Sequence, residues 1–315
     1  MTMSKLAFIF PGQGSQKVGM LAELAKEYAV IEETFTEASE VLGYDLWALV
    51  QAGPQEELNL TERTQPMLLT ASVALWRAWQ QKNGVQPELM AGHSLGEWSA
   101  LVCAGVVDFK AAVKLVQLRG KYMQEAVPAG EGSMAAIIGL DDDVIVSVCE
   151  EAAQGEVVSA VNFNSPGQVV IAGNTAAVDR ACELCKEKGA KRAMPLAVSA
   201  PFHSALLRPA ADRLAEDIAG VTFNTPTIPV AHNVHAKTES DPEAIKKAMI
   251  EQIYHPVLWV ACVNTLVKEG VDTCVECGPG KVLSGLSKRI DRSIKSLATE
   301  TPELFSTALS TLSES

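Results

Sequence analysis

The sequence predicts an α/β protein in which a small domain is inserted into a larger one. Three short apolar segments, 5–10, 89–91 and 271–276, are each followed by a glycine-containing turn and a helical pattern, which indicates β-α units. Residues 129–197 instead follow the order β-α-β-β-α-β, which is typical of ferredoxin-like domains. The chain has 315 residues, of which 48% are hydrophobic and 20% charged, so it can bury a sizeable core.

The first part of the chain alternates strands and helices. A strand at Lys5–Phe10 ends in the turn 11–16, and helical periodicity follows through 20–24 and 31–42. Pro66 is expected in the first turn of a helix over 66–81, whose apolar face carries Leu69, Val73, Trp76 and Trp79. The remaining predicted elements are a strand at 89–91, a turn at 92–97, a helix to Gly105, and a helix from the N-cap Asp108 to Gln124.

The second part contains the small domain and the return to the large one. Its predicted elements are strands at 133–138, 157–163, 168–172 and 191–196, with helices at 141–153 and 176–188. A helix over 204–219, a strand at 227–234, helices within 242–268, a strand at 271–276 and a helix ending at 290 follow. We therefore assign 1–128 and 198–315 to the large domain and 129–197 to the small one.

Charge and hydropathy exclude several classes of protein. The net charge of −12 argues against a nucleic-acid partner, because a phosphate backbone requires a basic surface. No apolar run reaches the roughly 20 residues of a membrane span. The N-terminus has one early lysine and no small-residue cleavage site, so no signal peptide is expected. These features predict a cytoplasmic enzyme.

Cysteine and histidine pairs do not predict a metal site. Cys182 and Cys185 share a helix face, but Cys274 and Cys277 lie on a predicted strand, where positions i and i+3 point to opposite faces. His232 and His235 are excluded by the same argument if 227–234 is a strand. We expect buried thiols in a reducing compartment and no metal.

The segment Gly92-His93-Ser94-Leu95-Gly96 fits the pattern G-x-S-x-G between a strand and a helix. The glycines permit a sharp turn that exposes the serine hydroxyl, and the following helix directs its N-terminal amides to the same point. The sequence thus predicts that Ser94 is a nucleophile and that the amide of Leu95 binds an oxyanion. The alternative is a serine that only caps the helix.

A serine nucleophile requires a base, and the chain has five histidines. His203 lies where the small domain returns to the large one, and such junction loops line clefts, so it is the best candidate by position. No acidic residue stands out as a third member of a triad. The loop Gly12-Gln13-Gly14 lacks the third glycine of a dinucleotide fingerprint, because position 17 is Lys17. Its remaining role is to supply a second oxyanion-hole amide.

Taken together, these motifs resemble those of bacterial malonyl-CoA:acyl carrier protein transacylases over nearly the whole chain. The resemblance implies an α/β-hydrolase-like large domain with a parallel sheet, and a ferredoxin-like small domain. It implies a malonyl-serine intermediate and ping-pong transfer without a cofactor. The motifs are Pro11 to Gln16, Gly92 to Glu97, the Arg119 segment, Asn162 to Gly167, Pro201 to Ser204 and Gly278 to Gly280.

The resemblance also implies residue roles. Ser94 is the nucleophile and His203 its base, and a backbone carbonyl, here that of Gln252, orients the histidine. Gln13 and Leu95 form the oxyanion hole. Arg119 receives the malonyl carboxylate, and Phe202 and Asn162 complete the substrate pocket. A structural ion pair of Arg119 with Glu97 or Glu125 is the alternative.

The expected partners are malonyl-CoA and acyl carrier protein, with no nucleic acid and no membrane, and the chain is expected to be a monomer. Other interpretations remain open: a serine hydrolase or thioesterase, an acyltransferase that supplies a polyketide pathway, and a carrier-protein docking module without catalysis. Because carrier proteins are acidic, a local basic surface is required. Two strips qualify: Lys281, Lys288, Arg289, Arg292 and Lys295, and Lys186, Lys188, Lys191 and Arg192.

Overall fold

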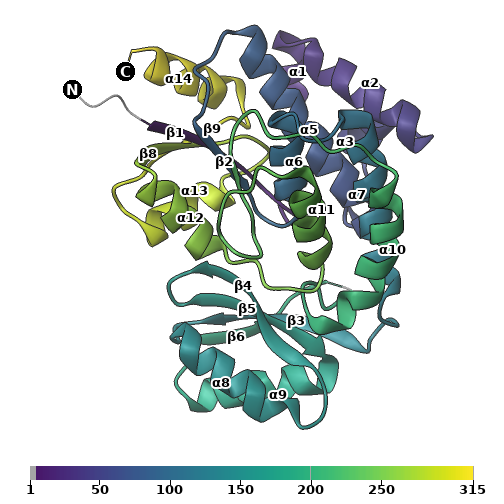
Figure 1. Ribbon diagram of the computed structural model, residues 1–315, viewed down its shortest axis with the longest axis vertical. Helices are drawn as coiled ribbons and strands as arrows, with labels where there is room; N and C mark the ends of the chain where they lie inside the picture. The colour runs from purple at the N-terminus through teal and green to yellow at the C-terminus, as the bar shows by residue number, and fades with distance from the viewer. Residues whose placement is uncertain (1–4, 199, 315) are drawn as a thin grey trace.

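The computed structural model describes residues 5–198 and 200–314, and it contains two separate sheets (Figure 1). The first sheet is parallel, with strand order β7-β2-β1-β8-β9. Its strands are β1 (Lys5–Phe10), β2 (Leu89–Gly92), β7 (Val230–Ala231), β8 (Val271–Glu276) and β9 (Lys295–Ala298). The predicted α/β class with a parallel sheet is confirmed.

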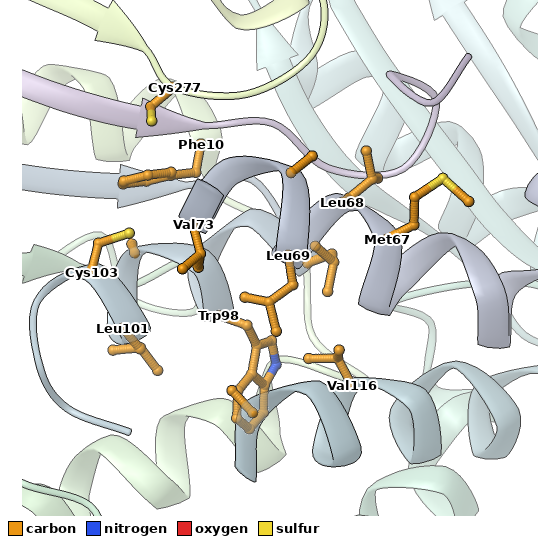
Figure 2. Close-up of a cluster of buried hydrophobic side chains, with 14 of the residues drawn as sticks. Phe10, Met67, Leu68, Leu69, Val73, Trp98, Leu101, Cys103, Val116 and Cys277 are labelled. Atoms are coloured by element: carbon orange, nitrogen blue, oxygen red, sulfur yellow. The ribbon is translucent and has the colours of Figure 1, made fainter. Parts of the chain in front are cut away.

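Helices surround the parallel sheet. They are α1 (Ala22–Glu27), α2 (Val30–Leu42), α3 (Leu46–Ala52), α4 (Gln55–Leu58), α5 (Thr61–Gln81), α6 (Leu95–Cys103), α7 (Phe109–Glu125), α10 (Arg208–Ala219), α11 (Pro242–Glu251), α12 (Trp259–Lys268), α13 (Val282–Ile290) and α14 (Pro302–Ser313). A short 3₁₀ turn, Ala205–Leu207, precedes α10. Figure 2 shows the core on one side of the sheet, where Phe10 of β1, Leu69 of α5, Trp98 of α6 and Val116 of α7 gather. This packing holds the end of β2 and the start of α6 in place.

The second sheet is antiparallel, with order β4-β5-β3-β6. Its elements are β3 (Gly132–Ile138), α8 (Asp142–Ala153), β4 (Val158–Ser165), β5 (Gln168–Asn174), α9 (Thr175–Glu187) and β6 (Arg192–Pro195). Figure 1 shows it at one end of the molecule, with α8 and α9 on its outer face. The order matches the predicted β-α-β-β-α-β pattern. The bounds 129–197 stay a prediction, and the large-domain limits at 1 and 315 lie outside the described residues.

Alternation along the strands buries both faces of the second sheet. In β5, Val169 and Ile171 pack with α8 and α9, whereas Val170 and Ala172 join the core of the large domain. In β4 the pairing register shifts between Ala160 and Asn162, where the strand meets the segment before α12. The small domain is therefore fixed against the large one at the strand that carries Asn162.

Some of the predicted elements need correction. The long helix begins at Thr61, so Pro66 lies inside α5, not in its first turn. The earlier start was not visible because the residues at 61–65 are polar, and yet Thr61, Thr64 and Gln65 are buried. The helices α3, α4 and α14 and the strand β9 were not predicted.

The predicted strand at 227–234 is reduced to the two residues of β7. After it the chain turns back, since the His232 amide donates to the Lys237 carbonyl and the Ala236 amide to the His232 carbonyl. The turn brings the His232 and His235 rings to a centroid separation of 5.7 Å, so the argument that a strand separates them is wrong. Cys274 of β8 and Cys277, the residue after β8, in contrast, pack in different core clusters.

Candidate active site

Ser94 occupies a sharp turn between β2 and α6. Its backbone has φ 52° and ψ −110°, a conformation that costs about 1–3 kcal/mol for a residue other than glycine. The turn forms only because glycines flank it: a Cβ on Gly96 would lie 2.0 Å from the Phe10 carbonyl oxygen, and one on Gly92 would lie 1.9 Å from that of Gly96. The Ser94 amide donates to Asn233 Oδ1 at 2.8 Å, which anchors the turn.

The hydroxyl of Ser94 and the imidazole of His203 are in contact. Ser94 Oγ lies 2.8 Å from His203 Nε2, and His203 Nδ1 lies 2.7 Å from the Gln252 carbonyl oxygen. A carbonyl only accepts, so Nδ1 carries the proton and Nε2 is free to accept one from Ser94. The orientation of the imidazole is therefore the one that a general base requires, and it is set without a carboxylate.

His203 is strongly biased toward its neutral form. Burial lowers its pKa from 6.5 to about 3, and the positive charge of Arg119 contributes to the same shift. Of the other histidines, His93 bonds to Asn164, His232 to Glu97 and His255 to the Glu251 carbonyl, and His235 lies in the turn after β7. His203 is the histidine that the structure brings to Ser94.

Arg119 of α7 is buried beside Ser94 and its direct partners are neutral. Nη1 donates to Gln65 Oε1 at 2.7 Å, and Nη2 donates to Gln252 Oε1 at 2.8 Å and to Ser94 Oγ at 3.2 Å. Burial lowers its pKa to about 10, and Glu97 opposes this shift through its charge. Within the described residues Nε has no partner.

The alternative ion pairs for Arg119 do not form. Among the residues that the structure describes, no carboxylate lies within ion-pair distance of its guanidinium, and Glu125 pairs with Arg213 at 2.6 Å. Glu97 instead contacts His232 and Gln252. The arginine therefore has donors available for an anionic ligand.

A pocket of about 140 Å³ joins these groups to the other predicted site residues. Gln13, Leu95, Asn162 and Phe202 all line it, together with Ser94, Arg119 and His203. No hydrogen bond among the described residues uses the backbone amides of Gln13 or Leu95. Asn162 Oδ1 is also buried and has no partner in the described part of the chain, so the pocket offers both donors and an acceptor to a ligand.

Sequence reasoning missed a second set of polar residues below Ser94. It consists of Gln65, Glu97, His232, Asn233 and the amide group of Gln252, all buried. Gln252 was expected to act through its carbonyl alone, and Glu97 was considered only as a direct partner of Arg119. A single acid in the first turn of an otherwise largely apolar helix was the available signal for Glu97.

Over the described residues, no helix is long and apolar enough to span a bilayer. The same residues contain no cluster of three or more histidine, cysteine or acidic side chains that could hold a metal ion. All seven cysteines are buried and unpaired.

Comparisons with known proteins match nearly the whole chain. A family described as the acyl transferase domain matches residues 7–301. A malonyl CoA-acyl carrier protein transacylase from Salmonella typhimurium is 61% identical over 307 residues, covering 98% of this chain and 99% of the relative.

Solved structures are equally similar. An acyl carrier protein S-malonyltransferase from Vibrio cholerae is 62% identical with a TM-score of 0.95, over 96% of this chain and 99% of that one. A malonyl-transacylase solved in complex with a type II polyketide acyl carrier protein is 58% identical with a TM-score of 0.97, over 98% of this chain and 100% of that one.

Proposed function

Because the chain belongs to the acyl transferase family, we propose that it transfers a malonyl group from malonyl-CoA to the phosphopantetheine thiol of an acyl carrier protein. The protein is an acyltransferase of fatty-acid biosynthesis. The observation that carries the proposed chemistry is a single contact chain, in which Ser94 Oγ meets both His203 Nε2 and Arg119 Nη2. A nucleophile, a base and a cation for the malonyl carboxylate thus meet at one oxygen.

In the first half-reaction, Ser94 Oγ attacks the thioester carbonyl of malonyl-CoA and its proton passes to His203 Nε2. The amides of Gln13 and Leu95 bind the oxyanion that forms. The carbon–sulfur bond then breaks, and the coenzyme A thiolate takes the proton from His203. The product is a malonyl ester of Ser94.

In the second half-reaction the carrier-protein thiol replaces coenzyme A. It gives its proton to His203 and attacks the ester carbonyl, and Ser94 leaves with the proton. One base serves both directions, so the reaction requires no cofactor. The carboxylate of the malonyl group binds the guanidinium of Arg119, and Phe202 and Asn162 line the space for the acyl group.

The malonyl carboxylate also assists the base. The charge of Arg119 is one cause of the low pKa of His203, and the imidazole's partner at Nδ1 is the carbonyl of Gln252 and not a carboxylate. A malonyl group that binds Arg119 offsets this charge and favours proton transfer to Nε2. An acetyl group provides no such compensation, which favours malonyl transfer at the chemical step as well as in binding.

Two alternatives are separated by one assay. A hydrolase would release free malonate from malonyl-CoA, whereas the transferase requires a carrier thiol. Product analysis with and without holo carrier protein distinguishes them: we expect malonyl carrier protein as the main product, and malonate as the main product in the presence of carrier would refute the proposal. Supply to a polyketide pathway is a second candidate because one relative was solved with a polyketide carrier, so both types of carrier should be compared.

We propose that carrier protein docks on the strip Lys281, Lys288, Arg289, Arg292 and Lys295. All five side chains are exposed, and Arg289 bonds to Gln168 of β5, so the strip adjoins the sheet that carries Asn162. Each strip has one lysine that pairs with an acid, Lys281 with Glu300 at 3.9 Å in the first and Lys186 with Glu183 at 2.8 Å in the second. Docking on the first strip offsets the repulsion between an acidic carrier and a chain of net charge −12.

We also propose a monomer that works in the cytoplasm. Among the described residues, the large exposed apolar side chains lie in five different segments of the chain: Leu60, Val85, Val146, Met194 and Val282. The unpaired cysteines are consistent with a reducing compartment.

A further inference from the structure

A buried carboxylate lies below the proposed active site without a role in the proposed reaction. Glu97 of α6 is fully buried. Its Oε1 accepts from His232 Nδ1 at 2.6 Å, and its Oε2 accepts from Gln252 Nε2 at 2.6 Å and from the Asn233 amide at 3.3 Å. A buried charge is tolerated only where another charge or several hydrogen bonds compensate it.

An opposite charge, Arg119, lies one side chain away. The Gln252 amide lies between the two: its Oε1 accepts from Arg119 Nη2 at 2.8 Å, and its Nε2 donates to Glu97 Oε2 at 2.6 Å. Arg119 is likewise a buried charge without a direct counter-charge, because its direct partners are neutral oxygens. The two residues are thus opposite charges joined by one polarised amide.

His232 does not cancel the charge of Glu97. Nδ1 carries the proton, since it faces a carboxylate oxygen. Nε2 is buried without a partner among the described residues, so protonating it would bury a second, unpaired N–H. A neutral His232 leaves Glu97 as the counter-charge available to Arg119.

We propose that Glu97 is the counter-charge of Arg119, held one side chain away by Gln252 so that the guanidinium keeps donors for the substrate carboxylate. A carboxylate in direct contact would stabilise the buried arginine equally well, but it would compete with the malonyl group. Glu97 is therefore a positioning residue that permits malonyl selectivity. The inference rests on the proposed role of Arg119 in binding malonyl.

The test first removes the negative charge at position 97 and then places it at position 252. Glu97→Gln removes the charge but keeps the side-chain shape, and the exchange variant Glu97→Gln/Gln252→Glu places a carboxylate directly against Arg119 while keeping the backbone carbonyl that faces His203. Glu276→Gln is the matched control. Glu276 is also fully buried, but it accepts from Ser284 and Leu283 at the start of α13, outside the proposed site.

Two quantities are measured for each variant: the melting temperature with and without malonyl or acetyl loading, and the ratio of kcat/KM for malonyl-CoA to that for acetyl-CoA. We expect Glu97→Gln to melt about 5 °C or more below wild type, with malonyl loading restoring more of the loss than acetyl loading. Its malonyl-to-acetyl ratio should be at least that of wild type, because an uncompensated guanidinium binds the malonyl carboxylate at least as tightly. The exchange variant should recover stability but lose at least about tenfold in the ratio.

The control should leave the ratio unchanged whatever its melting temperature. Wild-type stability in Glu97→Gln with an equal response to both acyl groups, or an exchange variant that retains the malonyl preference, would overturn the inference. If Glu97→Gln does not fold, the malonyl-to-acetyl ratio of the exchange variant tests the inference by itself. If wild type itself shows no preference for malonyl over acetyl, the proposed role of Arg119 fails first, and this outcome is visible before any variant is made.

Discussion

Replacing Arg119 by alanine should reduce malonyl transfer far more than acetyl transfer. A guanidinium has five N–H donors, of which one on Nη1 contacts Gln65 and the two on Nη2 contact Gln252 and Ser94. A malonyl carboxylate that accepts two parallel hydrogen bonds takes one from Nη2, in place of the contact with Ser94 or Gln252, and one from Nη1 or Nε. Each charge-assisted hydrogen bond contributes about 1.5–3 kcal/mol. Two such bonds give about 3–6 kcal/mol, which corresponds to a roughly 100-fold to 10,000-fold fall in the malonyl-to-acetyl ratio of kcat/KM.

The assay is kcat/KM for malonyl-CoA and acetyl-CoA on one preparation of each enzyme. The ratio removes effects common to both substrates, such as the lost contact between Arg119 and Ser94 or a reduced folded fraction. Arg119→Lys should restore the ratio only in part, because an ammonium group cannot donate two parallel hydrogen bonds. A ratio that stays within about threefold of wild type in Arg119→Ala, less than 1 kcal/mol, would show that carboxylate selectivity lies elsewhere.

Three further predictions concern the base, the pocket and the carrier. Burial and Arg119 lower the pKa of His203 to about 3, so kcat/KM for malonyl transfer should not fall as the pH is lowered from about 8 to about 5. Arg119→Ala should move the loss of activity at acidic pH to a higher pH. A wild-type enzyme that loses activity with an apparent pKa of about 6.5 would contradict this. Phe202→Ala should improve the use of methylmalonyl-CoA relative to malonyl-CoA by about 1–3 kcal/mol, measured as the ratio of kcat/KM for the two donors. An unchanged ratio would show that Phe202 is a core residue only. Charge reversal at Lys288 and Arg289 should raise KM for carrier protein and leave that for malonyl-CoA unchanged, and equal effects on both would exclude the strip as the docking site.

Local features of the site were predictable from the sequence. The turn at Ser94 was predicted because its glycines, strand and helix are adjacent in the chain, and the structure shows why each glycine is needed. His203 could be chosen only by its place at a domain junction, since it lies 109 positions from Ser94 and no local pattern links them. The role of Gln252 came from resemblance alone, because a backbone carbonyl leaves no signal in residue type.

The network around Glu97 was beyond sequence reasoning for a different reason. It depends on the turn at His232, where a strand was predicted and only two residues of β7 form. An acid in the first turn of α6 also has an ordinary explanation, since it favours the helix dipole. Only the packing of α6 against the turn after β7 shows that Glu97 is buried and that its second oxygen meets Gln252. Long-range polar contacts of this kind are set by tertiary structure.

The central claim is that Ser94 carries the malonyl group between the two thiols, and mass spectrometry of the acyl-enzyme tests it most directly. Wild-type protein mixed with malonyl-CoA alone should gain one malonyl group on the peptide that contains Ser94, and holo carrier protein should then remove it as malonyl carrier protein. Ser94→Ala should fold normally, because the hydroxyl contributes little to packing, and it should gain no adduct. A malonyl adduct of unchanged stoichiometry on Ser94→Ala, or a wild-type adduct that carrier protein does not discharge, would contradict the account.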